Sequence, residues 1–264
     1  MLSLVGLGIR LSLQDKTDMF NDQLLLTIPF SLTREDIQTK LSYALAPQEE
    51  VKEPPVSEEV EEEPVVEEVT FETVGDDYFQ DALFIGDSRT TGLEEYAAIP
   101  GAEYFAQEGM TVFNALTQID GTTIGNVDLP TLLTSRQFGK IYVMLGINEL
   151  GYPFNSLMNQ YTCLIDTLKK AQPDSIIYIC GNLNITASKS GQPAWLNMET
   201  VRHFNDETKA LCDNQQTFYI DINEKFCNEQ GYLRDEVTGD GVHPYASYYV
   251  EWKDWYYTKG IIKD

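Results

Sequence analysis

Short runs of apolar residues recur along the chain from Asp76 onward, and each is followed by a longer stretch of mixed character. The runs are nearly continuous in apolar residues rather than alternating, which is typical of strands buried on both faces of a sheet. We therefore predict five β-strands, at residues 82–86, 103–106, 140–146, 175–181 and 217–222.

The stretches between these runs favour helices. They lie at residues 90–98, 111–118, 156–171 and 198–212, and a last helix is expected after Pro244. Strands that alternate with helices over this length form a parallel sheet with helices on both faces. The predicted fold class is therefore α/β, a three-layer sandwich around a five-stranded parallel sheet. In such folds the functional residues gather at the carboxyl ends of the strands.

The chain ahead of these elements has a different character. Residues 1–46 form a small N-terminal region of unknown type, and so short a region rarely folds alone. Residues 47–72 are rich in Glu, Pro and Val, with eleven glutamates and one lysine between residues 49 and 72. A segment of this composition repels itself and stays extended. We therefore predict three parts: the N-terminal region 1–46, an acidic Glu/Pro-rich linker 47–72 and a domain 73–264.

The formal net charge of −24 argues against nucleic acid or an anionic membrane as a direct partner. The apolar start, residues 1–9, is too short to span a bilayer. It also lacks the basic start and the cleavage site of a signal peptide, so none is expected in this sequence. The compartment stays open between the cytoplasm and, with a signal upstream of this chain, a secreted or bacterial cell-surface location. The oligomeric state stays open as well.

Four cysteines and two histidines are present, without a C-x-x-C pair, so no metal site is expected. Cys163 and Cys180 lie in apolar runs and are predicted to be buried. A disulfide between Cys212 and Cys227 is left open.

The segment FIGDSRTTGL, residues 84–93, places Ser88 just after the first predicted strand and at the start of a helix. Gly86 permits a tight turn there. Free backbone N–H groups at a helix N-terminus stabilise developing negative charge. Ser88 is therefore a candidate nucleophile, and the alternative is that it only caps the helix.

The segment GDGVHP, residues 239–244, places Asp240 and His243 three residues apart. This spacing lets the carboxylate reach Nδ1 of the imidazole and leaves Nε2 free to act as a base. The other histidine, His203, lies in a helical pattern and is expected to be structural or on the surface.

Two further segments follow predicted strands. MLGINEL, residues 144–150, presents Asn148, whose amide can donate to an oxyanion. QEGMT places Gly109 after the second strand. Each signal is weak alone, because Asn and Gly are common in loops.

Together the four segments resemble the SGNH hydrolases, also called GDSL-like esterases and lipases, over residues 73–264. In that family a Gly-Asp-Ser segment supplies the nucleophile, a G-x-N-D block supplies a side-chain donor, and a D-x-x-H block supplies acid and base. The resemblance implies a flavodoxin-like SGNH hydrolase fold. It also implies a catalytic triad of Ser88, Asp240 and His243, and an oxyanion hole formed by Ser88, Gly109 and Asn148.

The chain departs from the family pattern at two positions: Arg89 replaces the Leu of the GDSL name, and Glu149 replaces the Asp of the third block. Arg89 is expected either at the rim, facing a substrate carboxylate, or in an ion pair with an acid such as Glu149 or Glu94. Tyr152 and Trp195 follow strand ends and offer flat faces to sugar rings. Arg89, Tyr152 and Trp195 are therefore the candidate substrate-binding residues.

The function that the resemblance implies is that of a serine esterase, with an acyl-enzyme on Ser88 and no metal or organic cofactor. The loops after the strands are short except residues 182–196, which are polar, so no long apolar insertion is seen that could cover a fatty chain. This favours short-chain acyl esters, above all O-acetyl groups on carbohydrate. The expected partner is thus a small ester or an acylated glycan. There are two alternatives: an O-acyltransferase that uses the same triad, and a catalytically silent binding module. The intact triad residues disfavour the binding module.

Overall fold

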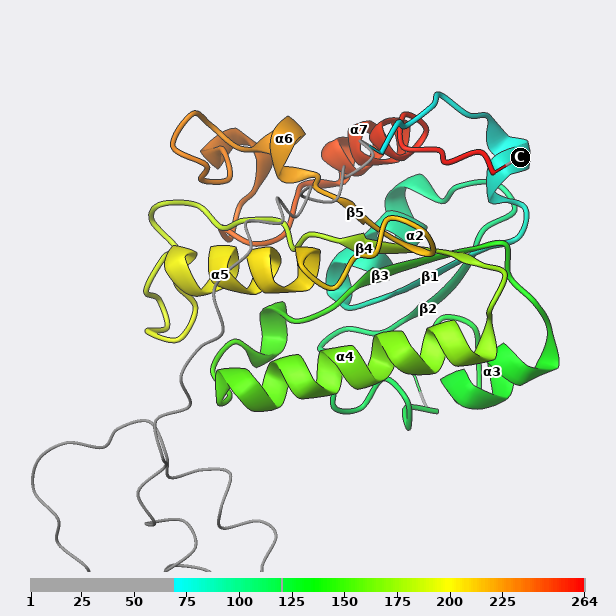
Figure 1. Ribbon diagram of the computed structural model, residues 1–264. Helices are drawn as coiled ribbons and strands as arrows, with labels where there is room; N and C mark the ends of the chain where they lie inside the picture. Colours follow the sequence, from blue (N-terminus) through cyan, green and yellow to red (C-terminus); the bar gives the residue numbers. More distant parts are fainter. Residues whose placement is uncertain (1–68, 120, 264) are drawn as a thin grey trace, which may run out of the picture. The chain divides into compact units, whose positions relative to one another are not determined.

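The computed structural model describes residues 69–119 and 121–263 (Figure 1). Within them lies one sheet of strands β1 Ala82–Gly86, β2 Glu103–Ala106, β3 Lys140–Met144, β4 Ile176–Cys180 and β5 Thr217–Ile220. All neighbours pair in parallel, in the order β2-β1-β3-β4-β5. The five predicted strands and the α/β class are therefore confirmed.

The helices of the described part are α2 Ser88–Ala97, α3 Leu129–Ser135, α4 Phe154–Ala171, α5 Met198–Lys209, α6 Asn223–Phe226 and α7 Ala246–Tyr256, with 3-10 turns η1 Asp76–Phe79, η2 Ile147–Glu149 and η3 Asp235–Val237. Helices α3, α4 and α5 share one apolar core with one face of the sheet. Helices α2, α6 and α7 share a second core with the other face. Figure 1 shows α4 and α7 on opposite sides of the sheet.

Aromatic side chains line the face of the sheet that α2 and α7 cover. Tyr104, Phe84, Tyr142, Tyr178 and Phe218 are paired in register across the five strands. The ring of Phe84 stacks on that of Tyr142 at 4.3 Å, and Tyr142 stacks on Tyr178 at 4.4 Å. Stacked rings on adjacent strands bury large apolar surfaces and fix the strand register.

The predicted helices differ from those of the structure in two places. Residues 111–118 form turns instead of the predicted helix, because the side chain of Asn114 accepts from both the N–H and the hydroxyl of Thr111 and competes with helical hydrogen bonding. Helix α3 was not predicted. It begins after Asp128, whose carboxylate caps the N–H of Thr131 at 2.7 Å.

The predicted N-terminal region 1–46 and residues 47–68 of the predicted linker lie outside the described residues. The last four linker residues, 69–72, pack against the domain. Glu72 and Gly260 exchange two backbone hydrogen bonds of 2.8 and 3.0 Å, and Phe71 packs on the α2/α7 core. The packed domain therefore begins before residue 73.

The strand order turns around between β1 and β3, since the chain continues from β1 to one edge of the sheet and from β3 to the other. In open α/β sheets, binding sites lie outside the carboxyl ends of the strands at this point. None of the helices within the described residues is both long enough and apolar enough to cross a membrane.

Candidate active site

Ser88 is the first residue of α2, two residues beyond the end of β1. The turn between strand and helix requires glycine at position 86. A Cβ there would overlap the side chain of Thr90 and would lie 2.9 Å from the carbonyl oxygen of Met144. The close approach of β1, β3 and α2 thus fixes where Ser88 leaves the sheet.

The structure brings Ser88, His243 and Asp240 into one hydrogen-bonded chain. Ser88 Oγ lies 2.8 Å from His243 Nε2, and His243 Nδ1 lies 2.7 Å from Asp240 Oδ2. With the Nδ1 proton donated to the carboxylate, Nε2 is left as an acceptor for the hydroxyl proton. This arrangement can withdraw the proton of Ser88 as its oxygen attacks an electrophile.

Asp240 is held by its neighbours in the ionised form. Its Oδ1 accepts from the backbone N–H groups of Val242 and His243 at 2.9 and 2.8 Å, and from the hydroxyl of Thr238 at 3.1 Å. Desolvation would raise the pKa of Asp240, but the hydrogen bonds from His243 outweigh it and hold that pKa well below its usual range. An ionised Asp240 orients the imidazole and stabilises its protonated form.

Two of the three predicted oxyanion donors, Ser88 and Gly109, line one pocket with His243, and Asn148 binds the residue after Gly109. Among the described residues, no group accepts from the backbone N–H of Ser88 or of Gly109. Gly109 has a φ of +72°, the left-handed region that glycine enters without strain. The amide Nδ2 of Asn148 donates to the carbonyl of Met110 at 3.1 Å, which occupies one of its two N–H groups. One amide N–H of Asn148 and two backbone N–H groups are thus available to an oxyanion.

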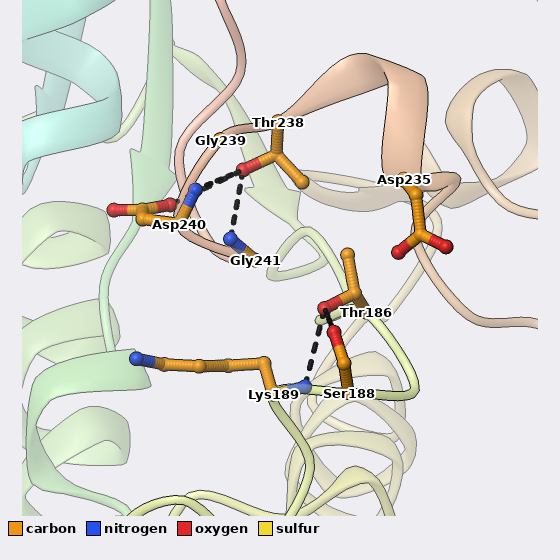
Figure 2. A pocket seen from close by; sticks show the side chains of 8 residues that line it. All are labelled: Thr186, Ser188, Lys189, Asp235, Thr238, Gly239, Asp240 and Gly241. Atoms are coloured by element: carbon orange, nitrogen blue, oxygen red, sulfur yellow. Dashed lines mark hydrogen bonds between the residues drawn. The ribbon is translucent and has the colours of Figure 1, made fainter.

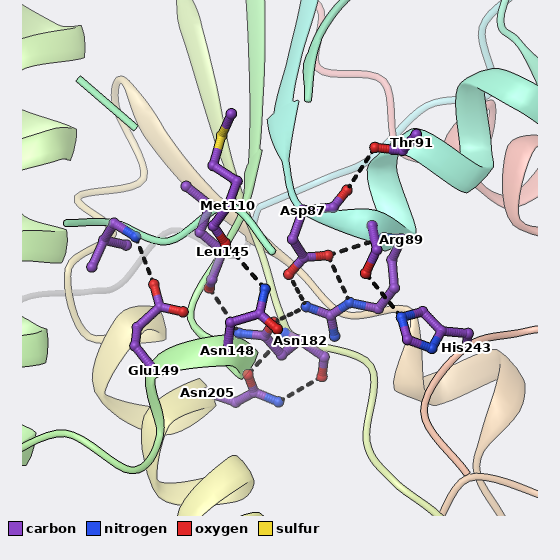
Figure 3. A network of polar contacts seen from close by, with 12 residues as sticks. Asp87, Arg89, Thr91, Met110, Leu145, Asn148, Glu149, Asn182, Asn205 and His243 are labelled. Atoms are coloured by element: carbon purple, nitrogen blue, oxygen red, sulfur yellow. Dashed lines mark hydrogen bonds and ion pairs between the residues drawn. The ribbon is translucent and has the colours of Figure 1, made fainter. Parts of the chain in front are cut away.

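The structure does not place Arg89 at the rim. Its side chain is completely buried, and it donates from Nε and Nη2 to the two carboxylate oxygens of Asp87 at 3.1 and 2.6 Å. Nη2 also donates to Asn182 at 2.6 Å (Figure 3). The predicted contact of Arg89 with a substrate carboxylate is therefore wrong. The predicted ion pair exists, but with Asp87 instead of Glu149 or Glu94.

This pair extends into a buried polar network. Asn182 follows β4 and donates to the carbonyl of Leu145, which follows β3, at 2.9 Å. Asn182 and Asn205 of α5 exchange two hydrogen bonds of 2.8 and 2.9 Å. The network therefore connects the ends of β1, β3 and β4 to α5 through Asp87 and Arg89, the two residues that flank Ser88 in the chain. Asn182 was not predicted, although its place at a strand end was a signal that could have revealed it.

Glu149, the other departure from the family pattern, is completely buried. Its Oε1 accepts from the backbone N–H of Val112 at 2.6 Å, and its Oε2 is buried without a partner among the described residues. Desolvation raises the pKa of Glu149 from its ordinary value of 4.5 to about 7. Asn148 and Glu149 together thus hold the segment 109–112 by the carbonyl of Met110 and the N–H of Val112.

A pocket of about 480 Å³ opens beside Ser88 and His243. Gly109 and Tyr249 form part of its wall, and the exposed Glu95 and Glu108 lie in it as well. Two carboxylates in the pocket beside Ser88 disfavour anionic ligands there. Neither they nor Tyr249 were predicted as part of the site.

The predicted substrate-binding residues Tyr152 and Trp195 are both exposed, at 58% and 43% of their surface. Tyr152 packs against a third exposed ring, Phe113, with 5.0 Å between ring centroids. Trp195 lies on the backbone of Gly151, where a Cβ would come 3.1 Å from its ring. Phe113, Tyr152 and Trp195, which we call the aromatic patch, therefore share the η2 side of the site. Phe113 was not predicted.

The remaining polar candidates lie elsewhere. His203 is exposed on α5, where its ring stacks on Phe154 and its Nδ1 lies 4.0 Å from Glu207 Oε1. All four cysteines are free, which closes the open question of a disulfide between Cys212 and Cys227. Cys180 is buried as predicted, whereas Cys163 is exposed. No cluster of potential metal ligands occurs within the described ranges.

The sequence profile of the GDSL-like Lipase/Acylhydrolase family matches residues 84–249. No curated protein matches the chain. A Streptococcus pneumonia protein described provisionally as a platelet activating factor is 22% identical in sequence. Its structure aligns with a TM-score of 0.52 over 66% of this chain and 83% of its own. A GDSL-like lipase from Bacteroides thetaiotaomicron is 13% identical and aligns with a TM-score of 0.51 over 68% of this chain and 86% of its own. At these identities the two structures show a shared fold.

Proposed function

The chain belongs to the GDSL-like lipase/acylhydrolase family, whose members act on ester bonds, and on that premise we propose that it is a serine esterase for short acyl esters of carbohydrate. The observation that carries the proposal is the chain of hydrogen bonds from Ser88 through His243 to Asp240, 2.8 and 2.7 Å long. In acyl transfer by a serine, such a chain of three side chains supplies the nucleophile, the base and the acid that orients the base, and this correspondence supports the proposal.

In the proposed reaction Ser88 Oγ attacks the ester carbonyl while His243 Nε2 takes its proton. The negative charge on the carbonyl oxygen is stabilised by the N–H groups of Ser88 and Gly109 and by the amide of Asn148. His243 then passes its proton to the leaving alcohol, and an acyl-enzyme on Ser88 remains. Water attacks the acyl-enzyme, gives its proton to His243, and the free acid leaves as Ser88 regains its hydrogen. These steps need no metal or organic cofactor.

The pocket supports a short acyl group. Its lining side chains include no aliphatic residue apart from Pro244, and two carboxylates border it. Beyond the rings of Tyr96 and Tyr249, a long acyl chain would lie against polar groups there and would gain little from burial. An acetyl group needs no such surface.

The aromatic patch supports a carbohydrate as the alcohol part of the ester. Exposed large apolar side chains on a soluble domain are typical of binding surfaces when they gather in one place. Flat rings with wet edges suit the apolar faces of sugar rings. Phe113, Tyr152 and Trp195 offer three such rings, and Tyr152 and Gly151, on which Trp195 lies, closely follow η2 with its Asn148.

The test is hydrolysis by wild type and Ser88→Ala, with Ser156→Ala as an exposed control on α4. Wild type should release acetate from acetylated xylan and turn over 4-nitrophenyl acetate faster than the octanoate ester. Ser88→Ala should lose roughly a thousandfold or more in kcat, and a serine-directed phosphonate should label Ser88.

Labelling elsewhere, or unchanged turnover in Ser88→Ala, would exclude Ser88 as the nucleophile. A rise in turnover from acetate to octanoate would exclude the short-acyl preference. Acetyl transfer to an added oligosaccharide in place of acetate release would identify an acyltransferase.

A further inference from the structure

A second pocket, of about 350 Å³, is lined in part by Asp240 and is separate from the one beside Ser88. It forms between the loop that follows β4 and the turn that carries Asp240 (Figure 2). Its size is at the lower end of the range of about 300–1,000 Å³ for small-molecule sites. All six side chains that line it are polar: Thr186, Ser188, Lys189, Asp235, Thr238 and Asp240. We call it the polar pocket.

One wall of the polar pocket carries Asp240, the acid of the proposed triad. The hydroxyl of Thr238 accepts from the N–H groups of Asp240 and Gly241 at 3.3 and 3.0 Å, and it donates to the Asp240 carboxylate at 3.1 Å. The N–H of Thr186 donates to the carbonyl of Gly241 at 3.1 Å and joins the opposite wall to this turn. A ligand in the polar pocket would therefore lie beside the acid that orients His243.

Two charged groups of the polar pocket have no ion-pair or hydrogen-bond partner for their side chains within the described residues: the ammonium of Lys189 and the carboxylate of Asp235. Figure 2 shows them at opposite ends of the pocket, with the hydroxyls of Thr186 and Ser188 between them. These hydroxyls lie 3.1 Å apart and can turn toward a ligand. The polar pocket thus presents a cationic donor, Lys189, an anionic acceptor, Asp235, and the two hydroxyls between them.

These groups select against two classes of ligand. A fatty acyl chain would find no apolar side chain in the lining. An anion would meet the carboxylates of Asp235 and Asp240, which outnumber the single ammonium of Lys189. A neutral molecule with several hydroxyl groups matches the lining, because its hydroxyls can donate to Asp235 and accept from Lys189.

We infer that the polar pocket is a subsite for a sugar ring of the glycan whose ester is cleaved at Ser88. This inference rests on the proposed esterase function for its place in the reaction. The ring bound here is a neighbour of the acylated sugar, and Lys189 of the polar pocket lies in the same loop after β4 as Trp195 of the aromatic patch. Lys189 and Asp235 determine affinity for the glycan and take no part in the chemical steps.

The test separates binding from turnover. Binding of unsubstituted β-1,4-linked hexasaccharides of glucose, xylose and N-acetylglucosamine to the full-length Ser88→Ala protein is measured by calorimetry. Lys189→Ala and Asp235→Asn in that background should each weaken binding of at least one hexasaccharide about tenfold, the usual effect of a hydrogen bond to a charged group. Lys170→Ala and Asp174→Asn remove the same charges from exposed positions near the amino end of β4 and should leave the affinity unchanged.

In the active protein, Lys189→Ala and Asp235→Asn should raise KM for an acetylated oligosaccharide while leaving 4-nitrophenyl acetate turnover unchanged. No binding of any hexasaccharide, or equal affinity in all variants, would overturn the subsite. An equal loss on both substrates would also overturn it, since it would show that the residues only support the fold of the Asp240 turn. If the wild type has no esterase activity, the proposed function fails, and the calorimetry still decides the subsite.

Discussion

Replacing Glu149 by glutamine should change how the stability of the protein depends on pH. The carboxyl group is completely buried, accepts one hydrogen bond from Val112 and leaves Oε2 without a partner among the described residues. Glutamine has nearly the same shape and keeps an oxygen for Val112. It also carries no charge, so it imitates the protonated form of Glu149 at every pH.

The magnitude follows from the pKa of about 7 in the folded protein against 4.5 for an ordinary glutamate. The pKa is raised, so the folded state binds the proton more tightly than the unfolded state. The resulting stability is complete below about pH 4.5 and is lost as the pH rises through 7. The total is about 3 kcal/mol, and roughly 2–3 kcal/mol of it disappears between pH 5 and pH 8.

The assay is urea unfolding at pH 5, 6, 7 and 8 for wild type, Glu149→Gln and the exposed-loop control Glu229→Gln. Other buried acids titrate equally in all three proteins and cancel in the differences. The free energies of unfolding of wild type and Glu149→Gln should be similar at pH 5, and the variant should be the more stable at pH 8 by about 2–3 kcal/mol. The control should follow the wild-type curve. Parallel curves for wild type and Glu149→Gln would refute the reasoning, because Glu149 would then titrate alike in the folded and unfolded states.

Three further changes test the site. Asn148→Ala should lower kcat for 4-nitrophenyl acetate by about 10²–10³-fold, the usual loss for one oxyanion donor, and a loss below threefold would exclude that role. Arg89→Met should lower the free energy of unfolding by about 3–5 kcal/mol, because Asp87 stays buried without its partner. Adding Asp87→Asn should recover part of this loss in urea unfolding, and no recovery would contradict the pairing argument. Glu95→Gln combined with Glu108→Gln should raise kcat/KM for an anionic ester several-fold relative to a matched neutral ester at low salt, with a smaller effect at high salt. An unchanged ratio would show that these carboxylates do not act on the substrate.

The strands could be predicted because burial on both faces leaves an almost continuous apolar run, and tertiary contacts then reinforce what the sequence already favours. The segment at 111–118 is different. Its apolar spacing permits a helix, but the side chain of Asn114 binds the start of the segment instead. The missed helix α3 had a readable signal, an acid followed by a proline at its second position, which is typical of a helix start.

Among the site residues, Ser88, Asp240 and His243 could be found because each stands in a short segment whose chemistry is local. The geometry between the segments was not readable, since Ser88 and His243 are 155 residues apart and only the parallel sheet brings them together. Arg89 was misplaced for a related reason. Its position after the nucleophile indicates proximity to the site, but the direction of its side chain depends on Asn182, which is 93 residues away.

The direction of the Arg89 side chain also explains why an arginine can replace an apolar residue beside Ser88, the proposed nucleophile. A buried ion pair is seldom more stable than well-packed apolar side chains of the same volume, because both charges lose their hydration. The pair of Asp87 and Arg89 gives something that apolar packing lacks, namely directed bonds at fixed angles. Asp87 precedes Ser88, and Arg89 binds the residue that also joins β3 to β4 through the carbonyl of Leu145. The turn that carries Ser88, the proposed nucleophile, is therefore fixed to three strand ends at once. A reacting hydroxyl needs such support in order to stay within hydrogen-bond reach of its base.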